Sequence, residues 1–154
     1  DIDSSKIPPD PFEVLTNCRI WIMDVDERMY TEYMNCCSAE NYEGLSFSAK
    51  YADYLVTGKI VLCHVKPNKE VNDKLHTFSV KSTDRWYVHS AVCSQSEWIV
   101  TKDPDFFDPV FKRDTRTCKE KMVSGKGCVA KYLKKKLGVE SIHIENAFAI
   151  ILSE

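Results

Sequence analysis

A glycine–lysine turn, SGKG at residues 124–127, precedes the lysine-rich segment CVAKYLKKKL at residues 128–137. Glycines such as Gly125 and Gly127 let backbone N–H groups converge at the N-terminus of a following helix, where anions are favoured. A nucleotide-binding P-loop has the pattern G-x-x-x-x-G-K-[ST] after a buried strand, and this segment lacks both the first glycine and the strand. The segment therefore excludes a P-loop but is compatible with an anion site at a helix N-terminus.

The lysines of this segment fall on one side of a predicted helix. At 100° per residue, the apolar residues occupy an arc of about 200°, which predicts a face packed on the core. Lys131, Lys134 and Lys135 occupy the opposite side, and Lys136 falls inside the apolar arc, where its stem would have to reach out to solvent. The residues expected on the core face are Cys128, Val129, Ala130, Tyr132, Leu133 and Leu137.

Basic residues are concentrated in this part of the chain. Residues 112–136 contain ten Lys or Arg and two acids, a net charge of +8, whereas the remainder carries −10. Such an asymmetry says more about partners than about fold. We expect a binding domain without enzymatic activity or cofactor whose basic helical region contacts nucleic acid or an acidic protein surface; a solvated helix face is the alternative. The expected contact residues are Lys112, Arg113, Arg116, Lys119, Lys121, Lys126, Lys131, Lys134 and Lys135.

Aromatic residues are the second residue type that commonly contacts nucleic acid. Trp86, Tyr87 and Trp98 fall on neighbouring predicted strands. Exposed aromatic rings on a sheet can stack against bases. The alternative is that the three rings fill the core.

The other chemically active residue types form no recognisable motif. The four histidines, His64, His76, His89 and His143, show no metal-ligand spacing, and no nucleophile or dinucleotide motif is present. The acids of DPDFFD, residues 103–108, lack the glycine and distal Glu of a calcium loop and are expected to form turns. We expect no metal site. A catalytic site assembled from residues distant in sequence would become evident only as a titratable pair converging in a cleft.

The seven cysteines leave at least one thiol unpaired within the chain. None is spaced C-x-x-C, and none of the asparagines begins a glycosylation sequon. These features favour an intracellular, reduced protein. The alternative is a secreted, disulfide-stabilised domain that binds a protein or small ligand, with Cys118 and Cys128 among its bridges.

The elements that must position these residues follow from the hydrophobic periodicity. After an extended lead-in at residues 1–11, residues 12–154 are expected to form one domain. Residues 18–25 predict a central strand, and residues 26–37 predict an amphipathic helix capped by Asp24 with Glu27 in a capping box. No apolar run approaches the roughly 20 residues of a membrane helix.

In the middle of the chain, apolar and polar residues alternate with a period of two residues. Residues 45–101 predict an antiparallel meander of four to six strands, including a hairpin of residues 74–80 and 85–92. A basic helix at about residues 112–123, the helix at 128–137 and an apolar strand at 141–152 complete the order β–α–β(4–6)–α–β. The predicted fold class is α+β, a bent sheet or half-barrel with two or three helices packed on it, with the terminal strands as neighbours.

Overall fold

The computed structural model describes residues 19–36, 42–111, 113 and 115–154. Its first half runs β1 (Trp21–Asp24), α2 (Arg28–Cys36), α3 (Tyr42–Val56), β2 (Ile60–Cys63), α4 (Lys69–Thr77) and α5 (Ser82–Cys93). Its second half runs β3 (Trp98–Thr101), η2 (Pro104–Phe106), α6 (Arg116–Val123), α7 (Cys128–Tyr132), the π-helical turn η3 (Leu133–Leu137), β4 (Glu140–His143) and α8 (Ile144–Ser153). The expected lead-in at residues 1–11 and the start of the domain at residue 12 lie outside the described residues.

Both sheets are parallel and two-stranded, so the predicted antiparallel meander is wrong. β1 pairs with β2, with Trp21 opposite Ile60, and β3 pairs with β4, with Trp98 opposite Glu140. Helices lie between the paired strands in the chain, because a parallel pair needs a crossover connection. The first and last strands are therefore not neighbours, and the described residues form more helices than the two or three expected.

The predicted hairpin at residues 74–80 and 85–92 is replaced by two helices. Asn68 accepts a hydrogen bond from Val71 N at 3.1 Å and caps α4, which buries Val71 and Leu75 one turn apart. In α5, Val88 and Ala91 are buried at a helical spacing of three. Apolar residues three or four positions apart suit a helix, although the same letters can be read as alternation over a short window.

Two more strand predictions are wrong. Residues 45–51, expected to be extended, belong to α3, which turns Tyr51 and Tyr54 toward a core cluster. The predicted closing strand at 141–152 splits, since β4 ends at His143, whose Nδ1 accepts a hydrogen bond from Glu145 N and caps α8. The apolar run of residues 147–152 is therefore helical.

Other elements agree with the sequence. β1, α2 and α6 lie within the predicted ranges. The helical segment after Gly127 ends at Gly138 in a left-handed conformation, φ 69°, which is the usual position for a C-terminal glycine cap.

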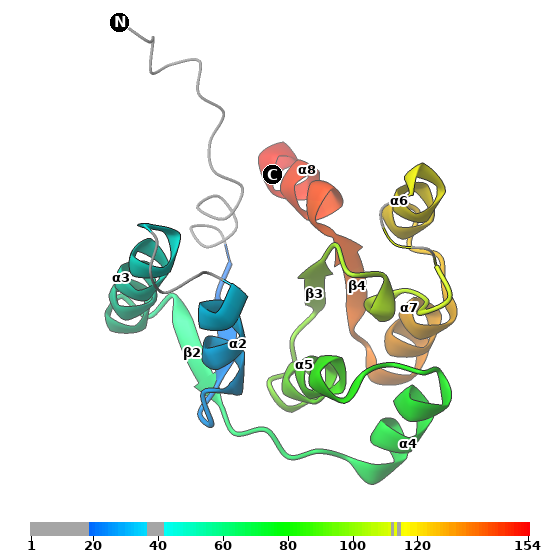
Figure 1. Ribbon diagram of the computed structural model, residues 1–154, viewed down its shortest axis with the longest axis horizontal. Coiled ribbons are helices and arrows are strands. Elements are labelled where there is room, and N and C mark those ends of the chain that lie inside the picture. The colour runs from blue at the N-terminus through cyan, green and yellow to red at the C-terminus, as the bar shows by residue number, and fades with distance from the viewer. Residues whose placement is uncertain (1–18, 37–41, 112, 114) are drawn as a thin grey trace, which may run out of the picture.

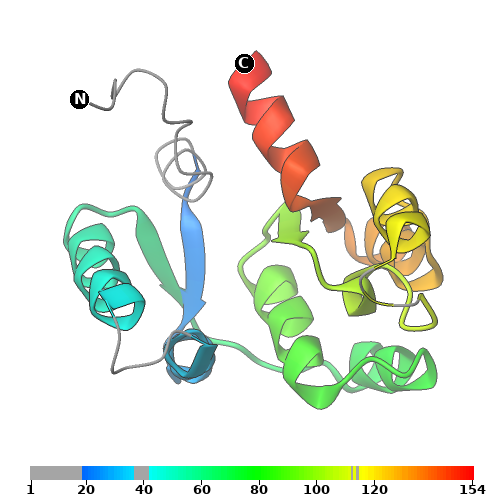
Figure 2. The same cartoon turned by 45° about the horizontal axis from the view of Figure 1, so that its top comes forward.

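The core consists of two clusters that share one residue. Met23, Met29 and Ile60 centre the cluster around β1 and β2, whereas Leu75, Phe107 and Leu133 belong to the larger cluster around α4 to α7. Tyr87 packs against both clusters. Figures 1 and 2 show β1 and β2 on one side, β3 and β4 on the other, and α5 between them. The helix α5 therefore connects the two halves of the molecule.

Candidate functional site

The N-terminus of α7 is occupied by the loop that follows β3. The carbonyl oxygen of Phe107 accepts hydrogen bonds from Val129 N at 2.9 Å and Ala130 N at 3.1 Å. Cys128 N lies 3.4 Å from the carboxylate of Asp108, which it approaches as a donor. The backbone N–H groups that the sequence makes compatible with an anion are therefore supplied with acceptors by the protein itself.

The predicted core face of this helical segment is confirmed. Val129, Ala130 and Leu133 are buried, and Cys128, Tyr132 and Leu137 are half-buried. In a π-helical turn the backbone hydrogen bonds span five residues, compared with four in an α-helix. It begins at Leu133, and Lys134, Lys135 and Lys136 are all exposed, including the lysine expected within the apolar arc.

Several of the predicted contact residues are engaged by acids. Arg116 pairs with Glu120 at 2.9 Å, Lys119 with Glu145 at 2.7 Å and Lys134 with Glu140 at 3.3 Å. Arg113 turns toward Asp103 and Asp105, at 3.1 Å from each. Lys112 lies outside the described residues.

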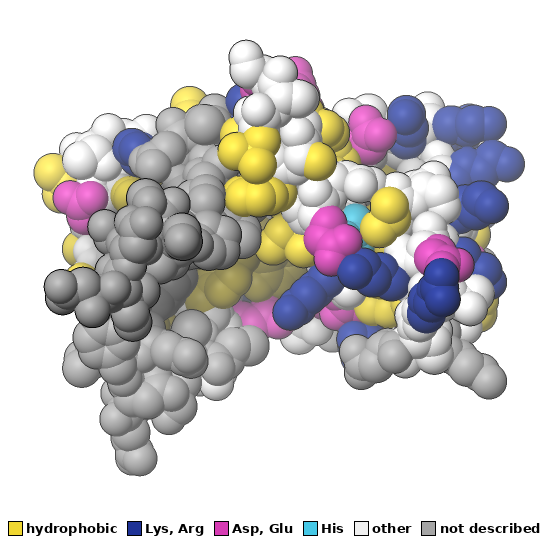
Figure 3. Space-filling view, turned by 90° about the horizontal axis from the view of Figure 1, so that it is seen from above, with side chains coloured by type: hydrophobic (Ala, Val, Ile, Leu, Met, Phe, Trp, Pro, Cys, Tyr) yellow, Lys and Arg dark blue, Asp and Glu magenta, His cyan; other side chains and the backbone are white. Residues whose placement is uncertain are grey.

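Five exposed lysines form no salt bridge among the described residues, and we call them the basic surface. They are carried by α6, the turn after it and the helix continued by η3. Both helices bury residues in the same core cluster, Cys118 and Met122 from α6 and Val129 and Leu133 from the second helix. Figure 3 shows Lys and Arg side chains gathered over this end of the molecule. The basic surface comprises Lys121, Lys126, Lys131, Lys135 and Lys136.

The three predicted aromatic contacts belong to α5 and β3, not to the helices that carry the basic surface. Trp86 donates its Nε1 hydrogen to Asp24 at 3.0 Å, and the guanidinium of Arg28 lies 3.9 Å from its ring centroid. Tyr87 donates its hydroxyl hydrogen to Glu32 at 2.7 Å. Burial, followed by this hydrogen bond, raises the pKa of Tyr87. Trp98 lines a cavity opposite β1. The structure thus does not place these rings beside the lysines.

A carboxyl pair lies between the start of α5 and the loop after β3. Asp84 and Asp105 are 8 % and 5 % exposed. The pKa of Asp84 is raised to about 7. Burial is the largest cause, and the hydrogen bond to Asp105 and the charges of Asp103 and Asp105 raise the pKa further. Lys81, whose Nζ lies 4.0 Å from Asp105 Oδ2, opposes the rise. Asp84 therefore exchanges its proton near neutral pH.

Two cations border the carboxyl pair. The Lys81 side chain is 66 % exposed and that of Arg113 47 % exposed, whereas the Asp105 side chain is 7 % exposed. An anionic group approaching from solvent would meet these cations before the carboxyls. A strongly shifted titratable group in such a setting is a candidate for chemistry.

The sequence did not single out this pair. Asp84 belongs to KSTD, the turn between the two strands of the predicted hairpin, and Asp105 to the loop DPDFFD. The residues STD at the beginning of α5 resemble a helix start, which is the one local signal available. Nothing local indicates that the two segments meet.

In the part of the chain that the structure describes, no three or more His, Cys, Asp or Glu side chains are arranged to hold a metal ion. None of the helices in that part has the length and apolar character that a membrane span requires. Cys118 and Cys128, which the sequence suggests as members of disulfides, form none in the part of the chain that the structure describes, and neither do Cys63 and Cys93.

Comparison with protein-family models, with curated protein sequences and with solved structures finds no match to this chain.

The Asp84 carboxyl is expected to make stability depend on pH. Its pKa is about 7 in the folded protein and about 3.9 in an unfolded chain, so the folded state binds the extra proton between these values. The stabilisation is complete below about pH 4 and is lost as the pH rises through 7. After a discount for solvent screening, we expect the free energy of unfolding to fall by about 2 kcal/mol over this pH range. Asp84→Asn should abolish this fall.

Urea denaturation at pH 4.5, 6 and 8 measures this effect. Asp84→Asn should be more stable than the wild type at pH 8, and the difference should shrink toward pH 4.5. Asp73→Asn, at an exposed position of α4, is the matched control and should keep the wild-type pH dependence. If the stability of Asp84→Asn changes with pH in parallel with that of the wild type, the Asp84 carboxyl is not the titrating group.

Proposed function

We propose that the protein binds nucleic acid through the basic surface. The observation that supports this proposal is the presence of five exposed lysines without salt bridges, within the described residues, on two helices that share one core. Phosphate backbones are bound mainly through such charges, with release of counterions. Lysine supplies a flexible point charge that follows phosphates without requiring a fixed pairing geometry.

An acidic protein partner fits this surface less well. Protein interfaces obtain most of their affinity from buried aromatic or apolar anchors. Within the described residues, α6 and the helix continued by η3 expose no large hydrophobic side chain. A charged surface without an apolar anchor favours a polyanion over a folded protein.

The test is a fluorescence-anisotropy titration of labelled single-stranded RNA and DNA at several salt concentrations. For the triple variant of Lys126, Lys131 and Lys135 to glutamate, we expect weaker binding and a plot of log affinity against log salt that is shallower by about 2. This figure follows from about 0.7 per lost phosphate contact on a single strand.

The matched control changes Lys66, Lys69 and Lys102, three exposed lysines elsewhere in the fold, to glutamate. It alters the net charge by the same amount but leaves the basic surface intact, so it should retain most of the affinity. The proposal fails if the wild type does not bind, or if the control loses as much affinity as the test variant.

A second candidate function is hydrolysis of a phosphodiester at the carboxyl pair. The observation that favours it is a buried pair of carboxyls bordered by Lys81 and Arg113, in which the pKa of Asp84 is raised to about 7. A general acid or base works best with a pKa near the operating pH. Asp84 would act as the general acid or base beside Asp105, with Lys81 and Arg113 receiving the phosphate.

Cleavage of labelled single-stranded oligonucleotides with Mg²⁺, with Mn²⁺ and with EDTA tests this candidate. Loss of a general acid or base lowers the rate about 100-fold or more, so Asp84→Asn and Asp105→Asn should be nearly inactive while Asp73→Asn cleaves normally. Cleavage that persists in both pair variants would assign the activity to a contaminant. Absence of cleavage by the wild type would reject hydrolysis and leave the binding proposal standing.

A further inference from the structure

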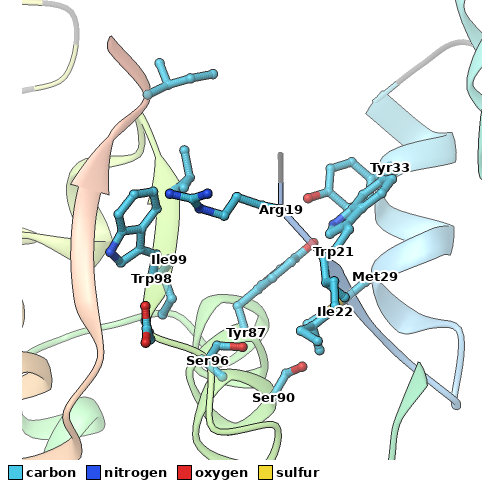
Figure 4. Close-up of a pocket in the computed structure, with 15 residues that line it drawn as sticks. Arg19, Trp21, Ile22, Met29, Tyr33, Tyr87, Ser90, Ser96, Trp98 and Ile99 are labelled. Atoms are coloured by element: carbon cyan, nitrogen blue, oxygen red, sulfur yellow. The ribbon is translucent and has the colours of Figure 1, made fainter. Parts of the chain in front are cut away.

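A cavity of about 530 Å³ opens between β1 and β3, with α5 as its floor (Figure 4). This volume lies within the range of small-molecule sites, about 300–1,000 Å³. Its walls are mainly aromatic and aliphatic and come from elements far apart in the sequence. The side chains that shape it are Trp21, Ile22, Met29, Tyr87, Trp98 and Ile99.

Ser90 contributes a buried polar atom to this cavity. The residue is 2 % exposed, and its Oγ has no hydrogen-bond partner among the described residues. Figure 4 shows its hydroxyl rising from α5 toward the side of the cavity formed by Ile22. A buried hydroxyl without a partner is costly and uncommon in folded proteins. A ligand N–H or O–H in the cavity would satisfy it.

Arg19, the cation at the mouth of the cavity, is already paired with an acid. Arg19 reaches across the opening (Figure 4), and its Nη2 lies 2.8 Å from each carboxylate oxygen of Glu154. Its guanidinium also lies 5.1 Å from the ring centroid of Trp98. An anionic ligand would have to compete with Glu154 for Arg19 and would also meet Glu97 in the lining, so the cavity suits a molecule without negative charge.

The rings around the cavity favour edge-to-face contacts. Trp21 and Tyr33 already form one such contact, with centroids 5.5 Å apart and planes at 78°. Aromatic pairs in this geometry gain more than their buried area alone provides. We propose that the cavity between β1 and β3 binds a small neutral aromatic molecule that donates a hydrogen bond to the Ser90 hydroxyl.

Two probes of nearly the same shape separate the hydrogen bond from apolar burial. Indole carries an N–H donor, whereas benzothiophene carries none. Isothermal titration calorimetry should show saturable binding of both probes, with indole preferred about fivefold, the equivalent of one ordinary hydrogen bond. In Ser90→Ala this preference should disappear while benzothiophene binds as before. An unchanged preference in that variant would overturn the assignment of Ser90.

A filling variant locates the binding. Val100→Trp places a large ring at a position that lines the cavity and is 37 % exposed, and Val61→Trp places the same ring on β2, outside the cavity, at a position that is 45 % exposed. The first should abolish binding of both probes, and the second should leave both affinities unchanged. Absence of saturable binding to the wild type, or equal binding to both tryptophan variants, would overturn the proposal. If Val100→Trp does not fold, the Ser90→Ala comparison decides it.

Discussion

Replacing Gly127 by alanine is expected to destabilise the protein by about 4 kcal/mol. A Cβ at this position would lie 2.1 Å from the carbonyl oxygen of Phe107 and 2.4 Å from its carbonyl carbon, both of them backbone atoms. Its φ of 132° is also a conformation that side chains rarely adopt. The loop or the helix must therefore move, although the same carbonyl oxygen accepts the hydrogen bonds of Val129 N and Ala130 N.

Gly125, two residues earlier in the same turn, is the matched control. Its φ is 66°, but nothing lies within 4 Å of an added Cβ, so Gly125→Ala should cost only about 1 kcal/mol for the left-handed backbone. Urea denaturation of both variants measures the difference. Equal losses would show that close approach to the loop is unimportant, and that the two glycines serve only the turn.

This pair of glycines also shows what the sequence could and could not predict. The core face of the helix after Gly127 was predictable because its apolar residues repeat at helical spacing and Gly138 ends it. The approach of Phe107 to Gly127 was not predictable, because it joins two segments without a shared local pattern. The same two glycines suggested an anion site, which the Phe107 carbonyl and the Asp108 carboxylate occupy instead.

The wrong fold class has a physical cause in short sequence windows. In residues 85–92, Val88 and Ala91 satisfy helical spacing, yet β-branched and aromatic residues raise the strand propensity of the same window. At the C-terminus the run AFAIIL suggested a buried strand, but only Ala147 and Ile151 are buried in α8, and Leu152 is 60 % exposed. Tertiary packing, rather than local preference, determines the secondary structure of these segments.

The candidate site depends even more on tertiary structure. The charge asymmetry of residues 112–136 is visible in the sequence, but which lysines remain without salt bridges depends on acids elsewhere, such as Glu145 beside Lys119. The carboxyl pair joins the start of α5 to the loop after β3. Each acid alone has an ordinary role at a turn, whereas burial of Asp84 first, and then the approach of Asp105, raise the pKa of Asp84.

Asp24→Ala should be nearly as damaging as Gly127→Ala. The carboxylate of Asp24 is 1 % exposed and accepts three hydrogen bonds of 3.0 Å, from Arg28 N, Met29 N and Trp86 Nε1. The first two cap α2, and the third ties α5 to β1. The sequence predicted the cap by Asp24, whereas the expected partner Glu27 adopts a left-handed conformation, φ 59°.

Because alanine leaves three donors without an acceptor, we expect a loss of about 4 kcal/mol. Trp86→Phe removes only the side-chain donor and should cost about 1 kcal/mol. Asp26→Ala, at an exposed position two residues later, should change the stability by less than about 0.5 kcal/mol. If Asp24→Ala and Asp26→Ala have similar urea midpoints, Asp24 does not hold α2 and α5 on β1. A large loss restricted to Asp24 would instead show that one carboxylate joins β1 and α2 to α5.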